Sequence, residues 1–144
     1  MSSRHMSRHA ALQILYAWEF NNKQADLAEV SSEVFGDYDQ GVLDKDFVSA
    51  LVVGVKEHLE EIDNIIIPYC NDGPFENVSI LDKSILRLGV YELMILKDVP
   101  PKVAIDEAVE VAKSFGGEGS AKLASGILGK LYEVHFAENE KPTE

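Results

Sequence analysis

The chain contains almost no cysteine, no long apolar run and few basic side chains. Its single cysteine, Cys70, cannot form a disulfide framework within the chain. No apolar stretch reaches the roughly 18 residues that a membrane-spanning helix needs, and no hydrophobic signal segment opens the sequence. These absences argue against a disulfide-stapled secreted domain and a membrane protein, and we expect a cytoplasmic location.

Basic residues are also unevenly placed. The 144 residues carry 13 Lys and Arg against 25 Asp and Glu, a net charge of −12. Residues 26–76 alone hold 13 acidic and 2 basic side chains, so the remainder of the chain is close to neutral. Such a balance argues against a broadly basic nucleic-acid surface. It suits a basic protein partner, or it serves solubility alone.

Apolar residues recur at helical spacing along most of the chain, whereas strand patterns are scarce. The fold class predicted from this pattern is all-α, a compact bundle of six or seven helices forming one domain over 1–144. The predicted helices span residues 8–20, 26–34, 43–67, 80–96, 101–115 and 120–135. We expect residues 1–7 to form a flexible arm, with Met6 as an alternative natural start, and residues 137–144 to form a frayed tail.

Several helix boundaries have their own sequence signals. Ser79 followed by Asp82 resembles a capping box, with aspartate in place of the longer glutamate. Pro101 suits the first turn of a helix, where its missing N–H is not needed. Gly116-Gly117 predicts a helix end, and Ser120 is the predicted cap of the last helix.

Residues suited to catalysis or metal binding are few and scattered. None of the four histidines has a Cys or carboxylate neighbour at metal-ligand spacing, and no GxxxxGK[ST] loop is present. The glycines between Gly116 and Gly119 do not follow a predicted strand, so a dinucleotide cradle is not indicated. We therefore predict no metal, no cofactor and no enzymatic activity.

Four segments in order carry a family resemblance: SRHAALQILYAWE, ILRLGVYEL, DVPPKVAIDEAVEVAKSFGGEGSAK and SGILGKLYE. The chain resembles the NusB family of transcription antitermination factors from about Ser7 to Glu133. The resemblance implies two small helical sub-bundles. It also implies binding to the boxA element of ribosomal RNA leader transcripts, together with NusE, a small-subunit ribosomal protein. The pair joins an antitermination complex on RNA polymerase, and family members are monomers or homodimers.

The resemblance also implies individual site residues. Those matching the RNA-contacting positions of the family are Arg4, Arg8, Tyr69, Lys113, Phe115, Ser120 and Lys122. The match is incomplete, because His5 and Met6 stand where further arginines are common. Leu123 and Ser125 replace an aromatic residue and an amide, and Asp72 stands where a basic residue would help. An alternative role for Phe115 is to seal the core at a helix end.

Acidic positions implied to face NusE are Glu76 and Asp82, with Tyr91 and Glu92 on the adjoining helix. We expect Arg87 to pair internally or at the rim of this surface. Two alternatives remain open at this point. One is a helical adaptor that binds protein only, its RNA surface having decayed. The other is the NusB-like domain of a ribosomal RNA cytosine methyltransferase, which requires a downstream catalytic domain.

Overall fold

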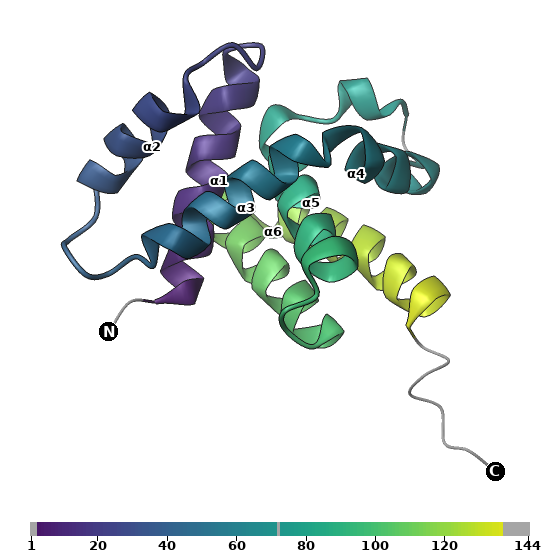
Figure 1. Ribbon diagram of the computed structural model, residues 1–144. Coiled ribbons are helices and arrows are strands. Elements are labelled where there is room, and N and C mark those ends of the chain that lie inside the picture. Colours follow the sequence, from purple (N-terminus) through teal and green to yellow (C-terminus); the bar gives the residue numbers. More distant parts are fainter. Residues whose placement is uncertain (1–2, 72, 137–144) are drawn as a thin grey trace.

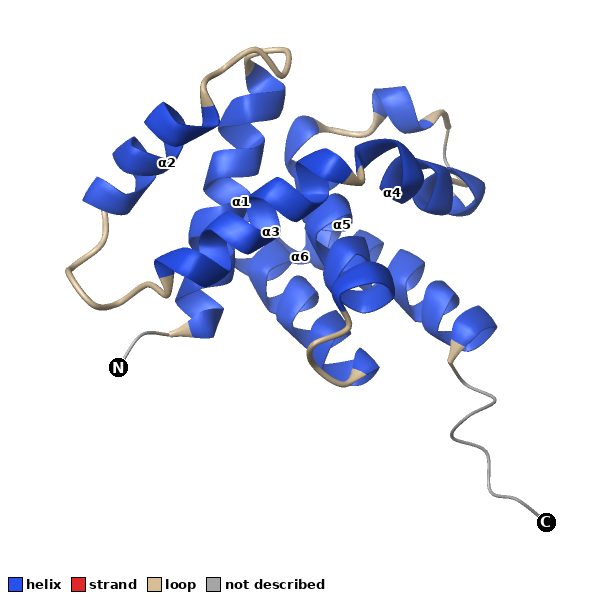
Figure 2. Cartoon of the chain, viewed as in Figure 1, coloured by secondary structure: helices blue, strands red, loops and turns tan. Residues whose placement is uncertain are grey.

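The computed structural model describes residues 3–71 and 73–136 (Figure 1). Within these ranges every regular element is helical (Figure 2). The one β-type contact there is an isolated bridge between Ser3 and Leu43. The α-helices are α1 (Arg4–Phe20), α2 (Leu27–Gly36), α3 (Lys45–Glu57), α4 (Leu59–Ile66), α5 (Ile80–Val90) and α6 (Pro101–His135). Two 3₁₀ turns, η1 (Ile67–Tyr69) and η2 (Phe75–Asn77), and a π-helical segment, η3 (Tyr91–Leu96), complete the list. The prediction of an all-α fold is confirmed.

Helix α5 lies at the centre of the molecule (Figure 1). It packs against α6, α1 and α4, whereas α2 and α3 pack mainly on α1. Every residue from Ser84 to Val90 is buried, as expected for a helix surrounded by others. Arg87 in this segment bonds Asp63 of α4 at 2.8 Å and Glu19 of α1 at 3.3 Å. Its predicted internal pairing is confirmed, and the pairing links α1 and α4 to α5.

The N-terminal turn is ordered, contrary to the prediction of a flexible arm. Ser3 caps α1 by accepting a hydrogen bond from the Met6 backbone N–H at 3.1 Å. The Ser3 N–H donates to the Val42 carbonyl at 2.7 Å, and the Ser7 hydroxyl donates to the Ser3 carbonyl at 2.7 Å. Four further residues therefore join the helix predicted from residue 8. Residues 1–2, like the predicted tail 137–144 and Asp72, lie outside the described ranges.

The single helix predicted for residues 43–67 is two helices, α3 and α4, separated at His58. His58 has φ −107° and ψ 20°, which departs from helical geometry. Val55 and Ile62 are fully buried on opposite sides of the break. Because the apolar stripe continues in phase across His58, its periodicity gave no sign of the interruption.

Most of the boundaries of α5 and α6 lie where the sequence predicted them. Ser79 accepts a hydrogen bond from the Asp82 N–H at 3.1 Å, so the predicted cap is formed. The helix predicted for 80–96 changes to π-helical geometry at Tyr91 and ends at Lys97, whose φ is +54°. Pro101 occupies the first position of α6, as predicted.

A single residue bends α6 into two halves. Gly117 has φ +76° and ψ −162°, the one non-helical conformation between Pro101 and His135. The break predicted at Gly116-Gly117 is therefore confirmed. Ser120 is not the cap that the sequence suggested, because helical geometry resumes at Glu118 and places Ser120 within the first turn. This bend positions the residues of the predicted RNA surface.

Candidate nucleic-acid interface

Arg8 and Glu92 are buried against each other. Their exposed fractions are 4% and 2%. The Arg8 Nε donates to both Glu92 carboxylate oxygens at 3.0 and 2.9 Å, and its Nη2 donates to Oε1 at 2.9 Å. The predictions that Arg8 contacts RNA and that Glu92 contacts a protein partner are therefore wrong for direct contact. Tyr91 is buried as well, its ring lying so close to Gly54 that a Cβ there would overlap it.

The buried pair is electrostatically coupled. Burial raises the pKa of Glu92, and the hydrogen bonds and charge of Arg8 offset only part of that rise. For Arg8, burial acts to lower the pKa, but the hydrogen bonds and charge of Glu92, together with the charges of Glu107 and Asp98, outweigh it, so its pKa is raised. Glu107 adds a second carboxylate 3.5 Å from the Arg8 Nη1. The cluster joins the start of α1 to η3 and α6.

Arg4 remains at the surface, one turn before Arg8. Its side chain is 53% exposed and pairs with Asp98 at 3.0 Å. The guanidinium also lies 4.2 Å from the centre of the Phe47 ring, a cation–π contact. Of the two predicted arginines, only Arg4 is placed where a phosphate can reach it.

Phe115 and Lys113 lie at the end of the first half of α6. Phe115 is 38% exposed, and its other face packs on His9 of α1, with ring centroids 5.2 Å apart. It therefore both covers the core and presents a ring to solvent. The Lys113 side chain is 60% exposed and forms a long ion pair of 3.8 Å with Glu118, across the bend.

A groove of about 750 Å³ brings together residues that are distant in the sequence. Tyr69 of η1 lies on one wall, and Lys122, Leu123 and Lys130 of α6 lie on another. Leu123 occupies the wall where the family resemblance leads one to expect an aromatic ring. The sequence reasoning missed Lys130. Its spacing of eight residues from Lys122, about two helical turns, was the available signal.

Asp82 lines the same groove, which we call the Tyr69–Lys122 groove. Its buried Oδ1 has no hydrogen-bond partner within the described structure. Glu76 lies nearby in η2 and is exposed. Tyr69 and Lys122, two of the predicted RNA residues, thus line the same groove as Asp82, one of the predicted partner residues.

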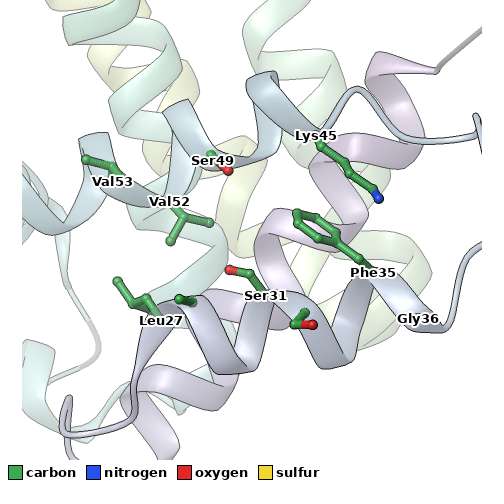
Figure 3. A pocket seen from close by; sticks show the side chains of 10 residues that line it. Leu27, Ser31, Phe35, Gly36, Lys45, Ser49, Val52 and Val53 are labelled. Atoms are coloured by element: carbon green, nitrogen blue, oxygen red, sulfur yellow. The ribbon is translucent and has the colours of Figure 1, made fainter.

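A second groove, of about 620 Å³, separates α2 from α3 (Figure 3). Its walls combine apolar Leu27, Phe35 and Val53 with the hydroxyls of Ser31 and Ser49. None of the predicted site residues lines it. It therefore does not extend the candidate interface.

Residues 3–71 and 73–136 contain neither a metal-binding cluster nor a membrane-spanning helix. No group of three or more His, Cys, Asp or Glu side chains there is arranged to hold a metal ion. No helix in the same ranges combines the length and apolar character needed to cross a bilayer. The main chemical feature of the candidate interface is therefore its exposed lysines, Lys113, Lys122 and Lys130, which lie beside the rings of Phe115 and Tyr69.

A helical protein with exposed lysines beside Phe115 on α6 and beside Tyr69 in the groove has a surface that suits binding to nucleic acid. The NusB family model matches residues 5–133. The chain belongs to the NusB family. It is 38% identical over 130 residues to the transcription antitermination protein NusB of Aeromonas hydrophila, covering 90% of this chain and 93% of that protein. It is 39% identical to the protein of the same name from Shewanella denitrificans, over 90% and 96% of the two chains.

Solved structures agree with the sequence relatives. T. maritima NusB superimposes with a TM-score of 0.81 at 33% identity, covering 96% of this chain and 97% of that one. A crystal structure of the antitermination factors NusB and NusE in complex with dsRNA has a TM-score of 0.78 at 26% identity. That match covers 92% of this chain and 97% of the other. The predicted family is confirmed.

Proposed function

We propose that this protein is a cytoplasmic, non-enzymatic transcription antitermination factor that binds boxA-type leader RNA of ribosomal transcripts. It does so together with a NusE-type ribosomal protein, and the pair joins an antitermination complex on RNA polymerase. The observation that carries the proposal is the convergence of Tyr69, Lys122 and Lys130 in one groove of a NusB-family fold. The whole chain acts as one domain, either as a monomer or as a homodimer.

The RNA contacts follow from the chemistry of the groove and of the bend in α6. Tyr69 is half-buried and can stack on an unpaired base, a contact worth roughly 1–3 kcal/mol per base. Lys122 and Lys130 are exposed cations that position phosphates. Phe115 and Lys113 repeat the same ring-and-cation pairing at the bend.

Arg4 and Ser120 have supporting roles. The Arg4 guanidinium is exposed and can pair with a phosphate after exchanging its contact with Asp98. Ser120 is half-buried in the first turn after the bend, where helix N–H groups favour an anion. Because the protein carries a net charge of −12, these local cations bind RNA weakly without a partner.

The partner surface consists of Glu76 and Asp82 at the edge of the Tyr69–Lys122 groove. Acidic groups there attract a basic ribosomal protein and repel free RNA. A bound partner neutralises them and supplies cations of its own, so RNA affinity rises on partner binding. Tyr91 and Glu92 lie outside this surface and act structurally, by fixing η3 against α3 and α1.

A salt-controlled RNA titration by fluorescence anisotropy tests the proposal. We expect boxA-like single-stranded RNA to bind more tightly than a scrambled sequence, and much more tightly when NusE is present. A duplex of the same sequence distinguishes single-strand from double-strand recognition. If NusE binds but RNA affinity never exceeds that for the scrambled strand, the protein is an adaptor for protein only, and the proposal fails.

Charge reversal at one lysine identifies the RNA-binding face. Lys122→Glu should weaken RNA binding and leave NusE binding within about twofold, since Lys122 contributes phosphate contacts. Lys56→Glu on α3 makes the same change in charge at an exposed position outside the groove. Equal effects of the two variants on RNA affinity would show that only net charge matters.

A further inference from the structure

Helices α2 and α3 leave an open groove between them, which we call the α2–α3 groove. Figure 3 shows Leu27, Ser31 and Phe35 of α2 on one wall and Ser49 and Val53 of α3 on the other. Both helices pack mainly on α1, and α2 contains no fully buried residue. The groove wall of α2 is therefore a face that α1 does not cover.

The groove has the shape and length of a docking surface for a helix. Leu27 and Phe35 are half-buried, and Val53 is 47% exposed. From Leu27 to Phe35 the wall is about 12 Å long, at a rise of 1.5 Å per residue. This length fits apolar anchors at i, i+4 and i+7 of a docked helix. An extended peptide would need a free sheet edge, and every regular element in the described ranges is helical.

The α2–α3 groove lies in a strongly acidic part of the chain. Residues 26–57 carry eight acidic and two basic side chains, a net of −6 and half of the charge of the whole chain. Glu29 and Glu33 on α2 and Asp46 on α3 are exposed. None of these three forms an ion pair with another described residue. Such carboxylates repel RNA phosphates and attract a basic protein segment.

One contact inside the groove indicates the ligand chemistry that it favours. The Lys45 ammonium lies 5.4 Å from the centre of the Phe35 ring, and both side chains line the groove. This cation–π contact holds a cation beside an apolar wall. A lysine or arginine next to the apolar anchors of a docked helix would meet the same ring and the nearby carboxylates.

We propose that the α2–α3 groove is a docking site for a basic, amphipathic helix of a second protein partner. The inference goes beyond the proposed function, because no residue lines both this groove and the Tyr69–Lys122 groove. The second partner can therefore bind while RNA and NusE occupy the other groove.

Charge also argues against two other occupants. A second copy of this chain carries the same net charge of −12 and would bring the same acidic groove. Residues 137–144 have three acidic side chains and one basic side chain, and no large apolar residue to serve as an anchor. A basic helix supplies both the apolar face and the opposite charge.

Fluorescence anisotropy with a labelled model peptide tests the site on the full chain. The probe is a helical peptide of about four turns, with leucines at i, i+4 and i+7 and lysines on its other faces. The control peptide has glutamate in place of every lysine. We expect the lysine peptide to bind at least about tenfold more tightly. If the two peptides bind alike, or if neither binds, the inference fails and the proposed function stands, because no RNA enters this assay.

A pair of valine variants tests the apolar wall. Val53→Ser should weaken binding of the lysine peptide about fivefold, because it removes exposed apolar surface from the groove. Val134→Ser makes the same change at a valine of α6 that is 61% exposed and lies outside the groove, so it should leave the affinity unchanged. Equal effects of the two variants would place the peptide elsewhere and overturn the inference.

Charge variants test the acidic side of the groove. Glu29→Lys with Glu33→Lys should weaken binding of the lysine peptide about tenfold. Asp106→Lys with Glu110→Lys is the matched control, since these two residues are also exposed and four apart on one helix, α6. Equal weakening by both pairs would mean that only net charge matters, and the inference would fail.

Lys45→Gln should change the affinity in the opposite direction. It removes the cation that already occupies the Phe35 ring, so the lysine peptide should bind about threefold more tightly. Weaker binding by this variant would contradict the proposed contact with the ring. Thermal unfolding of every variant separates a loss of fold from a loss of binding.

Two further measurements identify the occupant. Saturating NusE and boxA-like RNA should leave the affinity for the lysine peptide within about twofold. Displacement of the peptide by NusE would assign the groove to NusE and overturn the claim of a second partner. Sedimentation of the protein alone should show no self-association through this face. A dimer that Val53→Ser dissociates would make a second copy the occupant and would also overturn the inference.

Discussion

Replacing Arg8 by methionine tests whether this arginine stabilises the fold through its buried ion pair with Glu92 or contacts RNA directly. The substitution keeps much of the length of the side chain but removes the guanidinium that makes three hydrogen bonds to Glu92. Glu92 is 2% exposed, so its carboxylate is left buried without its main partner. Breaking a buried ion pair in this way costs about 3–5 kcal/mol of folding free energy.

The double variant Arg8→Met with Glu92→Leu provides the decisive comparison. It removes both charges and fills the space with apolar atoms, a change that is often neutral or stabilising. Glu107, the remaining carboxylate near Arg8, is 27% exposed and stays partly hydrated. We therefore expect the double variant to regain most of the stability that Arg8→Met loses, with a coupling energy of about 2 kcal/mol or more.

Urea denaturation followed by circular dichroism gives the free energy of unfolding for each variant. Arg4→Met is the matched control, because it removes an exposed ion pair to Asp98 and should cost no more than about 1 kcal/mol. RNA titration of the double variant over several salt concentrations completes the test. The claim that Arg8 acts through its buried ion pair would be refuted by two results together. Arg8→Met would lower the free energy of unfolding no more than Arg4→Met does, and RNA binding by the double variant would depend less on salt.

Three further predictions concern the bend, the packing around Tyr91 and the groove. Gly117→Ala should destabilise the fold by about 1–3 kcal/mol, because φ +76° with ψ −162° is nearly restricted to glycine; thermal unfolding measures this. Gly54→Ala should destabilise by about 1–3 kcal/mol through overlap with the Tyr91 ring, whereas Gly129→Ala has free space and should stabilise by up to about 1 kcal/mol in the same assay. Burial raises the pKa of Cys70, so this thiol should react slowly with iodoacetamide at neutral pH and faster in alkali. Bound RNA should slow the reaction further, because Cys70 lines the Tyr69–Lys122 groove; unchanged labelling in the RNA complex would place the RNA elsewhere.

Much of the fold was predictable because it depends on local chemistry. Ser79, Pro101 and Gly117 each act within one turn of the chain, through a side-chain acceptor, a missing N–H and a positive φ. The break at His58 was not predictable, because buried residues continue in phase on both sides of it. The ordered turn at Ser3 was missed for another reason. Besides the local contacts of Ser3 with Met6 and Ser7, it depends on the Val42 carbonyl, which lies far along the chain and carries no sequence signal of its own.

The candidate site was predictable only as a set of residue types. Family resemblance identified Tyr69 and Lys122, but their meeting in one groove depends on how η1 lies against α6. The burial of Arg8 was not visible in the sequence, since an arginine near the N-terminus has the same pattern whether it binds phosphate or a distant glutamate. Its partner Glu92 lies 84 residues away.

That separation has a consequence for synthesis on the ribosome. The first helix emerges early, yet Arg8 cannot reach Glu92, nor His9 reach Phe115, until most of the chain has been made. Contacts between distant parts of a chain form late because the intervening loop must first close. Until α5 and α6 have been synthesised, the N-terminal helices therefore have an unpaired arginine and exposed apolar side chains. Folding is completed only after that point.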